Sequence, residues 1–367
     1  MTSHRRRASE RGTAGAPLSD ADRGAEAAGE RILLGHGSGG KLYRDLVKDV
    51  FVAAFANPVL ARLDDAAVLA PQGRIALTTD SHVVQPLVFP GGDIGRLSVA
   101  GTVNDLATAA ARPLALAAAF IIEEGFPLAD LRDLCAGAAT TAVEAGAPIV
   151  TGDTKVVERG AADGLFITTT GIGEIVVAHE LGSAAVRDGD AVILSGGVGD
   201  HAVAILAVRG ELKFSADVRS DCAPLWGLVE AAVGAARAAG GEEALRFLRD
   251  PTRGGLTTVL AELAEEAGLG IEVEEAAIPI SPAVRSVCDL LGYDPLTLAN
   301  EGKMVLVVAP QAADAVVAAV RKTRYGRDAR RIGFVTAAHP GRVALRTEYG
   351  TRRVLDMPVG ELLPRIC

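Results

Sequence analysis

The chain has 367 residues, 49% of them hydrophobic, and carries a formal net charge of −9. This length exceeds what one hydrophobic core usually supports, so we expect two domains, and the negative charge disfavours general nucleic-acid binding. Gly, Asp and Arg interrupt the apolar runs before any of them reaches the roughly 18 residues that a membrane span needs, so no transmembrane helix is predicted.

Cysteine is sparse, and the spacing of the cysteines argues against two classes of protein. The four cysteines form no C-x-x-C pair, which disfavours a zinc site and a disulfide framework and is typical of the reducing cytoplasm. Cys135 falls in an amphipathic helical pattern and Cys288 in another apolar segment. We expect both of these thiols to be buried.

Ordered structure is predicted to begin near Arg31. Residues 1–30 are rich in Ala, Gly and charge, and no apolar segment follows their three consecutive arginines, so they are expected to be a disordered extension and not a secretory signal. From there to residue 180, short apolar runs alternate with longer Ala-rich helical patterns, which predicts an N-terminal α+β domain. The expected strands are 75–79, 116–122 and 149–151, and the expected helices are 95–111 and 128–145.

A C-terminal α/β domain is expected over residues 181–349. A turn at 188–190 leads into an apolar run and then into a glycine-rich bend at 195–200. Residues 350–367 lack helical periodicity and are expected to form a strand and a mobile tail. The other expected elements are strands at 191–194, 271–274 and 304–308 and helices at 223–239 and 255–267.

Four aspartates of the first half stand beside apolar segments, where we expect strand ends. Carboxylates gathered at one edge of a sheet suit Mg²⁺, which takes oxygen ligands and bridges nucleotide phosphates. Mg²⁺ would also let an acidic protein bind a triphosphate. Any one Asp is better explained as a turn or helix cap, but four in similar settings favour a metal–nucleotide site. These residues are Asp65, Asp80, Asp105 and Asp153.

Residues 35–42 nearly match the phosphate-binding P-loop. The match fails at Leu42, which has no hydroxyl for Mg²⁺, and only a short apolar run precedes the loop. A glycine-rich lid whose backbone N–H groups approach phosphates is therefore predicted in place of a P-loop fold. An ordinary mobile loop is the alternative.

Two segments of the second half could carry further chemistry. Residues 249–255 lead into an amphipathic helix whose N-terminus suits an anion, with helix capping by Asp250 as the alternative. Glu301 precedes an apolar strand, which could hold a general base rigidly. The alternative for Glu301 is a surface turn with a solvated charge pair.

The chain ends in Cys367, where a thiol on a short tether can reach sites that a core thiol cannot. The terminal carboxylate should disfavour its thiolate form, whereas Arg365 should favour it. Pro364 stiffens the approach. This segment alone leaves a functional thiol and an accidental terminal cysteine equally plausible.

Together these segments resemble the HypE family of hydrogenase maturation proteins, within the superfamily of aminoimidazole ribonucleotide synthetase and selenophosphate synthetase. The resemblance spans essentially all of residues 31–367, and the order of the motifs with the terminal Pro-Arg-Ile-Cys makes it specific. The matching segments are 36–40, 64–68, 78–81, 91–95, 101–106, 152–155, 250–255, 300–303 and 364–367.

The resemblance implies a two-domain, PurM-like α+β fold that dimerises through its N-terminal strands and binds ATP with Mg²⁺. A HypF-like carbamoyltransferase would load Cys367, the chain would dehydrate the adduct to a thiocyanate, and a HypC–HypD-like iron scaffold would accept the cyanide. Glu301 and Lys155 would handle proton removal and orientation. The implied metal ligands are Asp65, Asp80, Asp105 and Asp153, and the implied nucleotide contacts are Gly39, Gly40, Lys41, Asp64, Thr79, Asn104 and Thr154.

Other enzymes of the same superfamily, and a protein without catalytic activity, remain open at this point. A selenophosphate synthetase should carry a reactive Cys near the N-terminal glycine-rich loop, but residues 1–134 contain none. Purine-pathway synthetases and thiamine phosphate kinases do not need a terminal Cys. The third possibility is a nucleotide-gated scaffold whose thiol contacts the metal of a partner.

Overall fold

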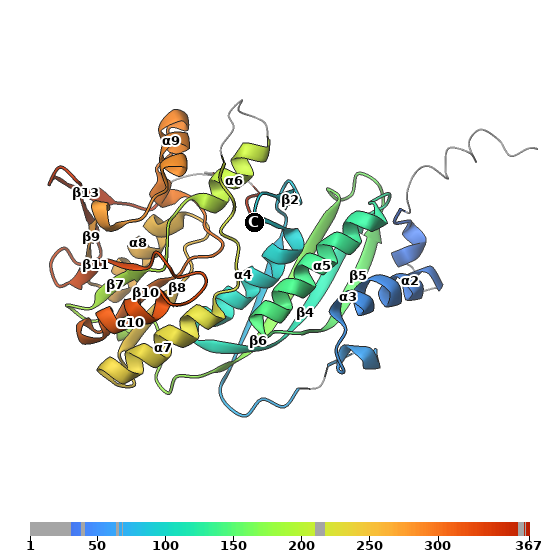
Figure 1. Ribbon diagram of the computed structural model, residues 1–367, viewed down its shortest axis with the longest axis horizontal. Helices are drawn as coiled ribbons and strands as arrows, with labels where there is room; N and C mark the ends of the chain where they lie inside the picture. Colours follow the sequence, from blue (N-terminus) through green and yellow to red (C-terminus); the bar gives the residue numbers. More distant parts are fainter. Residues whose placement is uncertain are drawn as a thin grey trace, which may run out of the picture.

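The computed structural model describes residues 31–37, 41–63, 66–67, 69–209, 217–358, 363 and 365–367. They form two sheet-and-helix units side by side (Figure 1). The predicted extension at 1–30 and most of the residues just before Cys367 lie outside the described residues. No helix in the described ranges has the length and apolar character that crossing a membrane requires.

The N-terminal unit is a four-stranded sheet covered on one face by two helices. The strand order is β1-β6-β4-β5; only the β4–β5 pair is parallel. Its elements are η1 (Leu34–Gly37), α2 (Lys41–Leu46), η2 (Val47–Val52), α3 (Ala53–Phe55), η3 (Leu60–Arg62), β1 (Ile75–His82), β2 (Val88–Phe89), β3 (Gly92–Asp93), α4 (Ile94–Thr108), β4 (Ala111–Glu123), α5 (Leu128–Ala145), β5 (Ile149–Val157) and β6 (Leu165–Ile175).

The C-terminal unit is a seven-stranded mixed sheet with the order β13-β12-β9-β11-β7-β10-β8. Its elements are η4 (Ser183–Ala185), β7 (Ala191–Leu194), α6 (Asp200–Arg209), α7 (Trp226–Gly240), β8 (Leu245–Arg249), α8 (Gly255–Ala267), β9 (Gly270–Glu274), η5 (Glu275–Ala277), α9 (Pro282–Leu291), η6 (Pro295–Thr297), β10 (Val305–Val308), η7 (Pro310–Ala312), α10 (Ala313–Val320), β11 (Arg330–Thr336), β12 (Val343–Arg346) and β13 (Arg352–Leu355).

Both faces of the C-terminal sheet are buried, which explains its continuous apolar strands. Successive side chains of a strand point to opposite faces. In β10, Val305 and Val307 join the core beneath α8, whereas Leu306 and Val308 join the core that contains α7 and α10. Strands β7 and β10 are therefore apolar at every position.

Helix α4 connects the two units. Twelve of its fifteen residues are buried, because the helix packs on the N-terminal sheet and on α5 and also contacts α7 and β8. Its approach to α5 requires glycine: a Cβ on Gly95 would lie 2.1 Å from the carbonyl oxygen of Leu134. Residues of α4 thus face both domains at once.

The second face of the N-terminal sheet is open. The side chains of β1 alternate, so Asp80 and His82 point toward α4 while Leu77 and Thr79 point away. On this open face, Leu77 is 71% exposed and Ile121 is 41% exposed. A sheet face with large exposed apolar side chains is typical of an interaction surface.

The α+β class and the two-domain architecture are confirmed. Most predicted elements match to within a few residues, although β1, β4 and β5 are longer than expected. Cys135 and Cys288 are buried, as predicted. The patterns did not reveal β6, β8, α6, α9, α10 or β11.

Candidate active site

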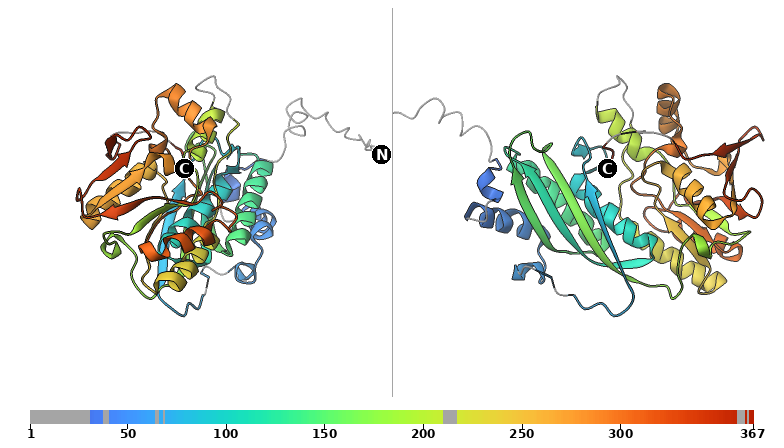
Figure 2. Two further views of the ribbon diagram at one scale, coloured as in Figure 1. Left: turned by 60° about the vertical axis from the view of Figure 1, so that its left-hand side comes forward. Right: turned by 180° about the vertical axis from the view of Figure 1, so that it is seen from behind.

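The end of the chain is docked between the two units (Figure 2). The carbonyl oxygen of Cys367 accepts a hydrogen bond from Val83 N at 3.1 Å, next to the end of β1. Nε2 of His201, in α6, lies 2.7 Å from the carbonyl oxygen of Ile366. The Ile366 side chain is only 4% exposed and joins the main core. The terminal segment is therefore held by backbone hydrogen bonds and an apolar anchor.

Arg365 turns its side chain away from the thiol. The residue has φ 50°, and its guanidinium donates to Val83 O at 3.0 Å, forms an ion pair with Asp163 and lies 6.0 Å from the Phe166 ring. The expectation that Arg365 favours the thiolate is therefore wrong. The cation that lowers the pKa of Cys367 is Arg253.

The docked thiol is a poor nucleophile. Burial, followed by the negative charges of Glu301 and Asp80, raises the pKa of Cys367 to about 12, against the opposing effect of Arg253. At neutral pH the docked sulfur is almost entirely protonated. This state suits a carrier of a bound group better than an attacking thiolate.

Glu301 is buried at the same place. Its side chain is 3% exposed, and Oε1 has no hydrogen-bond partner within the described part of the chain. The alternative of a solvated surface turn is therefore wrong. Burial raises the pKa of Glu301 well above its ordinary value, and four neighbouring carboxylates raise it further: Asp250, Asp221, Asp80 and Asp105.

The turn that carries Glu301 is fixed from both sides. Asp221 accepts hydrogen bonds from Glu301 N at 3.1 Å and Gly302 N at 3.2 Å, and it pairs with Lys303 Nζ at 3.0 Å. The amide of Asn104, in α4, donates to the carbonyl oxygen of Glu301 at 3.3 Å. A Cβ on Gly302 would lie 1.8 Å from Asp221 O, so only glycine fits there.

Asp80 and Asp105 form a carboxylate pair across β1 and α4. Oδ2 of Asp80 lies 3.2 Å from Nε2 of His82, and Asp105 accepts a hydrogen bond from Thr78 at 2.8 Å. Burial alone would raise the pKa of Asp80, but His82, the backbone N–H of Ser81 and the charge of Arg253 together lower that pKa overall. Burial and the charge of Asp80 raise the pKa of Asp105, although its hydrogen bond from Thr78 opposes them.

Asp250 adds a third carboxylate to this region. Burial first, and then repulsion from Asp105 and Asp80, raise the pKa of Asp250 to about 7. Gly254 is the N-cap of α8, so Asp250 does not cap this helix as the alternative had it. The site thus holds more negative charge than its cations balance.

This charge excess fits a hard divalent cation. Carboxylate oxygens are the ligands that Mg²⁺ prefers, and a cation would relieve the repulsion that raises the pKa values of Asp105 and Asp250. Within the described ranges, no three His, Cys, Asp or Glu side chains are grouped as a complete metal site. Of the predicted ligands, Asp65 lies outside the described residues, as do the predicted nucleotide contacts Gly39, Gly40 and Asp64.

Other predicted site residues lie elsewhere in the chain. Asp153 and Lys155 pair with each other at 2.6 Å on the open face of β5, the edge strand opposite β1. Three strand spacings, roughly 14 Å, separate the two edges. The expectation that the aspartates follow strand ends at one edge is therefore wrong: Asp80 lies within β1, Asp153 within β5, and Asp105 within α4.

The remaining predicted nucleotide contacts lie on different faces and elements of the structure. Thr79 lies on the open face and bonds Thr170 Oγ1 at 2.9 Å. Thr154 is buried at the opposite face of β5, and Lys41 begins α2. Asn104 is buried and fully engaged, since Leu225 N donates to its Oδ1 at 2.8 Å while its amide group donates to two carbonyl oxygens.

Three functional residues escaped the sequence reasoning. His201 follows the glycine-rich bend at 195–200, and Arg253 lies in the segment 249–255 that leads into α8, but neither position carries a local signal of its role. Asp221 sits in a short polar stretch without a recognisable pattern. Each acts through contacts made by distant segments, so only the fold reveals its role.

Comparisons with known proteins place this site in a family. The model for the N-terminal domain of AIR synthase related proteins matches residues 63–175, and the C-terminal domain model matches residues 187–346. The carbamoyl dehydratase HypE of Cupriavidus necator is 52% identical over 339 residues, which is 92% of this chain and 95% of that protein. The chain belongs to the HypE family. It is therefore an enzyme of the carbamoyl dehydratase class.

Solved structures of HypE proteins share the whole architecture. A HypE protein in complex with ATP has 46% identity and a TM-score of 0.85, covering 92% of this chain and 100% of the other. The HypE chain of a HypE–HypF complex has 45% identity and a TM-score of 0.74, covering 85% and 99%. Membership of the HypE family sets aside the selenophosphate synthetase and thiamine phosphate kinase readings.

Proposed function

We propose that this HypE-family chain uses ATP to dehydrate an S-carbamoyl group on its own Cys367 to a thiocyanate, the source of the cyanide ligand on [NiFe]-hydrogenase iron. The observation that carries the proposal is that the partly buried Cys367 lies close enough to the buried Glu301 for the charge of Glu301 to raise the pKa of the thiol. A carboxylate with a raised pKa is a strong base beside the group to be dehydrated.

The chemistry requires activation of a poor leaving group. The carbonyl oxygen of –S–CO–NH₂ attacks the γ-phosphorus of ATP, an O–P bond forms, and ADP leaves. Glu301 then removes a proton from nitrogen as the C–O bond breaks and phosphate departs. The second N–H proton passes to the departing phosphate, so –S–C≡N, ADP and hydrogen phosphate result, with one proton left on Glu301.

We assign nucleotide binding to the carboxylate region on the basis of the ATP-bound HypE structure. Asp80 and Asp105, with Asp65, would hold Mg²⁺, whose charge would neutralise the phosphates. Asp153 lies at the opposite edge of the sheet, so it would reach such a metal only in the site of a second copy. The glycine-rich segment with Gly39, Gly40 and Lys41 would cover the nucleotide. Asp64, Thr79 and Thr154 complete the proposed nucleotide contacts, and Asn104 acts by positioning the turn of Glu301.

We further propose that a second copy covers the open face of the N-terminal sheet. Large exposed apolar side chains on that face, such as Leu77 at 71%, support a homodimer through the strands. Asp153 and Lys155 lie on the same face, so we place their nucleotide and thiocarbamate contacts on the dimer side of the site.

A carrier thiol has to reach other proteins, both to be loaded and to deliver its group. A docked sulfur with a pKa of about 12 is a weak acceptor, so loading by a HypF-like carbamoyltransferase requires the tail to leave its groove. The solved HypE–HypF complex supports that partner. A HypC–HypD-like scaffold would then take the cyanide. Four free cysteines suit the reducing cytoplasm for this exchange.

The proposal is tested by ATP turnover with and without a loaded tail. Carbamoylated protein should release one ADP for each thiocyanate formed, whereas the unloaded protein and Cys367→Ala should release almost none. Tight ATP binding with equal turnover in loaded and unloaded protein would instead support a nucleotide-gated scaffold.

A further inference from the structure

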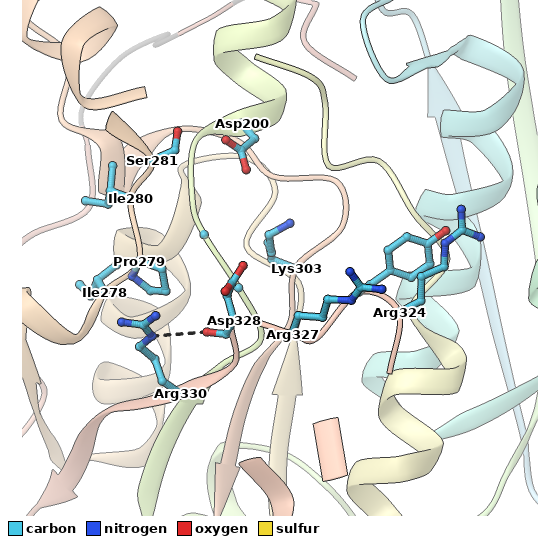
Figure 3. Close-up of a pocket in the computed structure, with 13 residues that line it drawn as sticks. Asp200, Ile278, Pro279, Ile280, Ser281, Lys303, Arg324, Arg327, Asp328 and Arg330 are labelled. Atoms are coloured by element: carbon cyan, nitrogen blue, oxygen red, sulfur yellow. Dashed lines mark hydrogen bonds between the residues drawn. The ribbon is translucent and has the colours of Figure 1, made fainter. Parts of the chain in front are cut away.

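A cavity of about 530 Å³ lies in the C-terminal unit. It is bounded by the glycine-rich bend after β7, by the segment between β9 and α9, and by the segment that leads into β11 (Figure 3). A cavity of this size can hold a metabolite. It contains none of the residues assigned above to the nucleotide or to the tail.

Basic side chains dominate one side of this cavity. Residues 321–331 contain five arginines and one lysine, in a chain whose net charge is −9. Arg324, Arg327 and Arg330 line the cavity from this segment, and Lys303 stands near its centre in Figure 3. Such a concentration of cations selects for an anionic ligand.

Two of these cations have no carboxylate to neutralise them. Lys303 pairs with Asp221 at 3.0 Å, and Arg324 pairs with Glu144 at 2.8 Å. For Arg327 and Arg330, no ion pair is formed within the described part of the chain; Arg330 only donates to the backbone oxygen of Asp328 at 3.4 Å. Unpaired guanidinium groups are suited to bidentate contact with a phosphate or carboxylate.

The glycine-rich bend after β7 supplies further hydrogen-bond donors at the border of the cavity. The N–H groups of Gly196 and Gly197 make no hydrogen bond to the described residues, although they border the cavity. A Cβ on Gly196 would lie 3.0 Å from Cε of Lys303, so glycine lets the backbone approach this side chain. Free amides beside cations are typical of phosphate sites.

The remaining walls define the rest of the ligand. Ile278, Pro279 and Ile280 form an apolar side that suits a sugar or ring. The carboxylates Asp200 and Asp328 also face the cavity. Burial, followed by the charge of Asp221, raises the pKa of Asp200 to about 6, which weakens its repulsion toward an anion below neutral pH.

We propose that this cavity is a second ligand site, for a small phosphate monoester whose phosphate binds Arg327, Arg330 and the amides of Gly196 and Gly197 while its organic part rests on Ile278 and Pro279. Lys303 links this site to the catalytic turn, because its other contact is Asp221, which holds the backbone N–H groups of Glu301 and Gly302. Lys303 therefore borders the ligand site and also pairs with the carboxylate that supports the general base.

Calorimetric titration with ribose 5-phosphate tests the site in the full-length protein, with a saturating non-hydrolysable ATP analogue present. We expect saturable binding of ribose 5-phosphate and no binding of ribose. Arg327→Gln and Arg330→Gln should each weaken binding by about tenfold, the loss expected for one charged phosphate contact. Arg342→Gln, which removes an exposed arginine outside the cavity, should leave the affinity unchanged.

Three results would overturn the proposal. These are absence of ribose 5-phosphate binding, equal binding by wild type and both cavity variants, and displacement of the sugar phosphate by the ATP analogue. The titration uses no carbamoylated protein. A negative result would therefore contradict the second ligand site without bearing on the dehydration proposed above.

Discussion

At the scale of single residues, the site depends on one buried acid, Glu301, whose main chain is held in place while its carboxyl group lacks a hydrogen-bond donor. Glu301 has a carboxyl oxygen without a hydrogen-bond partner in the described structure, and its main-chain groups are fixed by Asp221 and Asn104. This arrangement fixes the position of the base but gives its carboxyl oxygen no hydrogen-bond donor. A bound thiocarbamate N–H group could supply the missing donor.

The raised pKa of Glu301 predicts a pH-dependent rate. Below this pKa the side chain is a carboxylic acid and accepts no proton, and above it the carboxylate is the active base. The single-turnover rate of loaded protein should therefore still rise with pH at values well above 4.5, where an ordinary glutamate is already ionised, approaching tenfold per unit where the acid form predominates. A rate that is flat across this range would contradict the assignment of Glu301 as the base.

Asp200 allows a test of the electrostatics by stability alone. Its pKa is raised from 3.8 to about 6, so the folded state binds the proton more tightly than the unfolded state does, and stability falls as pH rises between these values. Asp200→Asn removes this dependence. The stability of Asp200→Asn relative to wild type, measured as the free energy of unfolding, should therefore be greater at pH 8 than at pH 5, by about 1 kcal/mol.

Denaturant unfolding at the two pH values measures this difference. Asp133→Asn, which changes an exposed acid of α5, is the matched control and should show no such dependence. An Asp200→Asn effect that is the same at pH 5 and pH 8 would contradict the raised pKa.

At the scale of elements, the docked terminus is held by few contacts. The backbone of 365–367 receives hydrogen bonds from Val83, Gln85, Arg209 and His201. Ile366 is buried in the main core, and Leu363 packs partly against the same core. Contacts this few can be broken and remade at modest cost. The tail can therefore alternate between the cleft and a partner.

His201 is the residue whose loss should loosen the tail. Its ring bridges Ser220 Oγ at 2.8 Å and Ile366 O at 2.7 Å. In His201→Ala, Cys367 should spend more time undocked with a pKa closer to that of a free thiol, so iodoacetamide should alkylate it at least about tenfold faster.

Peptide mass spectrometry of the alkylated protein measures this rate. His179→Ala is the control, because His179 also bonds a backbone oxygen, that of Leu245 at 2.7 Å, but does not touch the tail. The buried Cys135 should stay unmodified in both variants, which shows that each is folded. Equal alkylation of Cys367 in His201→Ala and wild type would exclude this role.

The elements themselves were largely predictable, whereas their arrangement was not. Periodicity locates α5, α8 and β7 because it reports which side of a segment is buried. It carries no information on strand order, so it could not place Asp153 at the edge opposite Asp80. The bond from His201 to Ile366 joins residues 165 positions apart and has no local signal. Cys367, Glu301, Asp80 and Asp105 were identified through their motifs, and the fold brings them into one region.

At the scale of the whole molecule, the two domains share one site because α4 is buried between them. It presents Asp105 to β1 and Asn104 to the turn of Glu301. Movement of one domain relative to the other would therefore alter both the carboxylate pair and the base. The open face of the N-terminal sheet takes no part in this contact and remains available to a second copy.

Leu77→Asp tests that second copy. Burying a leucine contributes about 1.5–3 kcal/mol, and a symmetric interface contains the change twice, so the dimer should weaken by at least about a hundredfold. Sedimentation velocity over a concentration series measures this shift. Val143→Asp is the control, because Val143 is 83% exposed on α5, away from the open face. A monomeric wild type, or equal dissociation in the two variants, would contradict the proposed dimer.

The central claim is that Cys367 carries the group that Glu301 helps to dehydrate at the expense of ATP. Mass spectrometry of the carbamoylated C-terminal peptide, before and after addition of ATP and Mg²⁺, tests it most directly. The account predicts loss of one water mass from the Cys367 adduct only when ATP is present, and an undehydrated adduct in Glu301→Gln. Loss of water without ATP, or dehydration by Glu301→Gln at the wild-type rate, would contradict it.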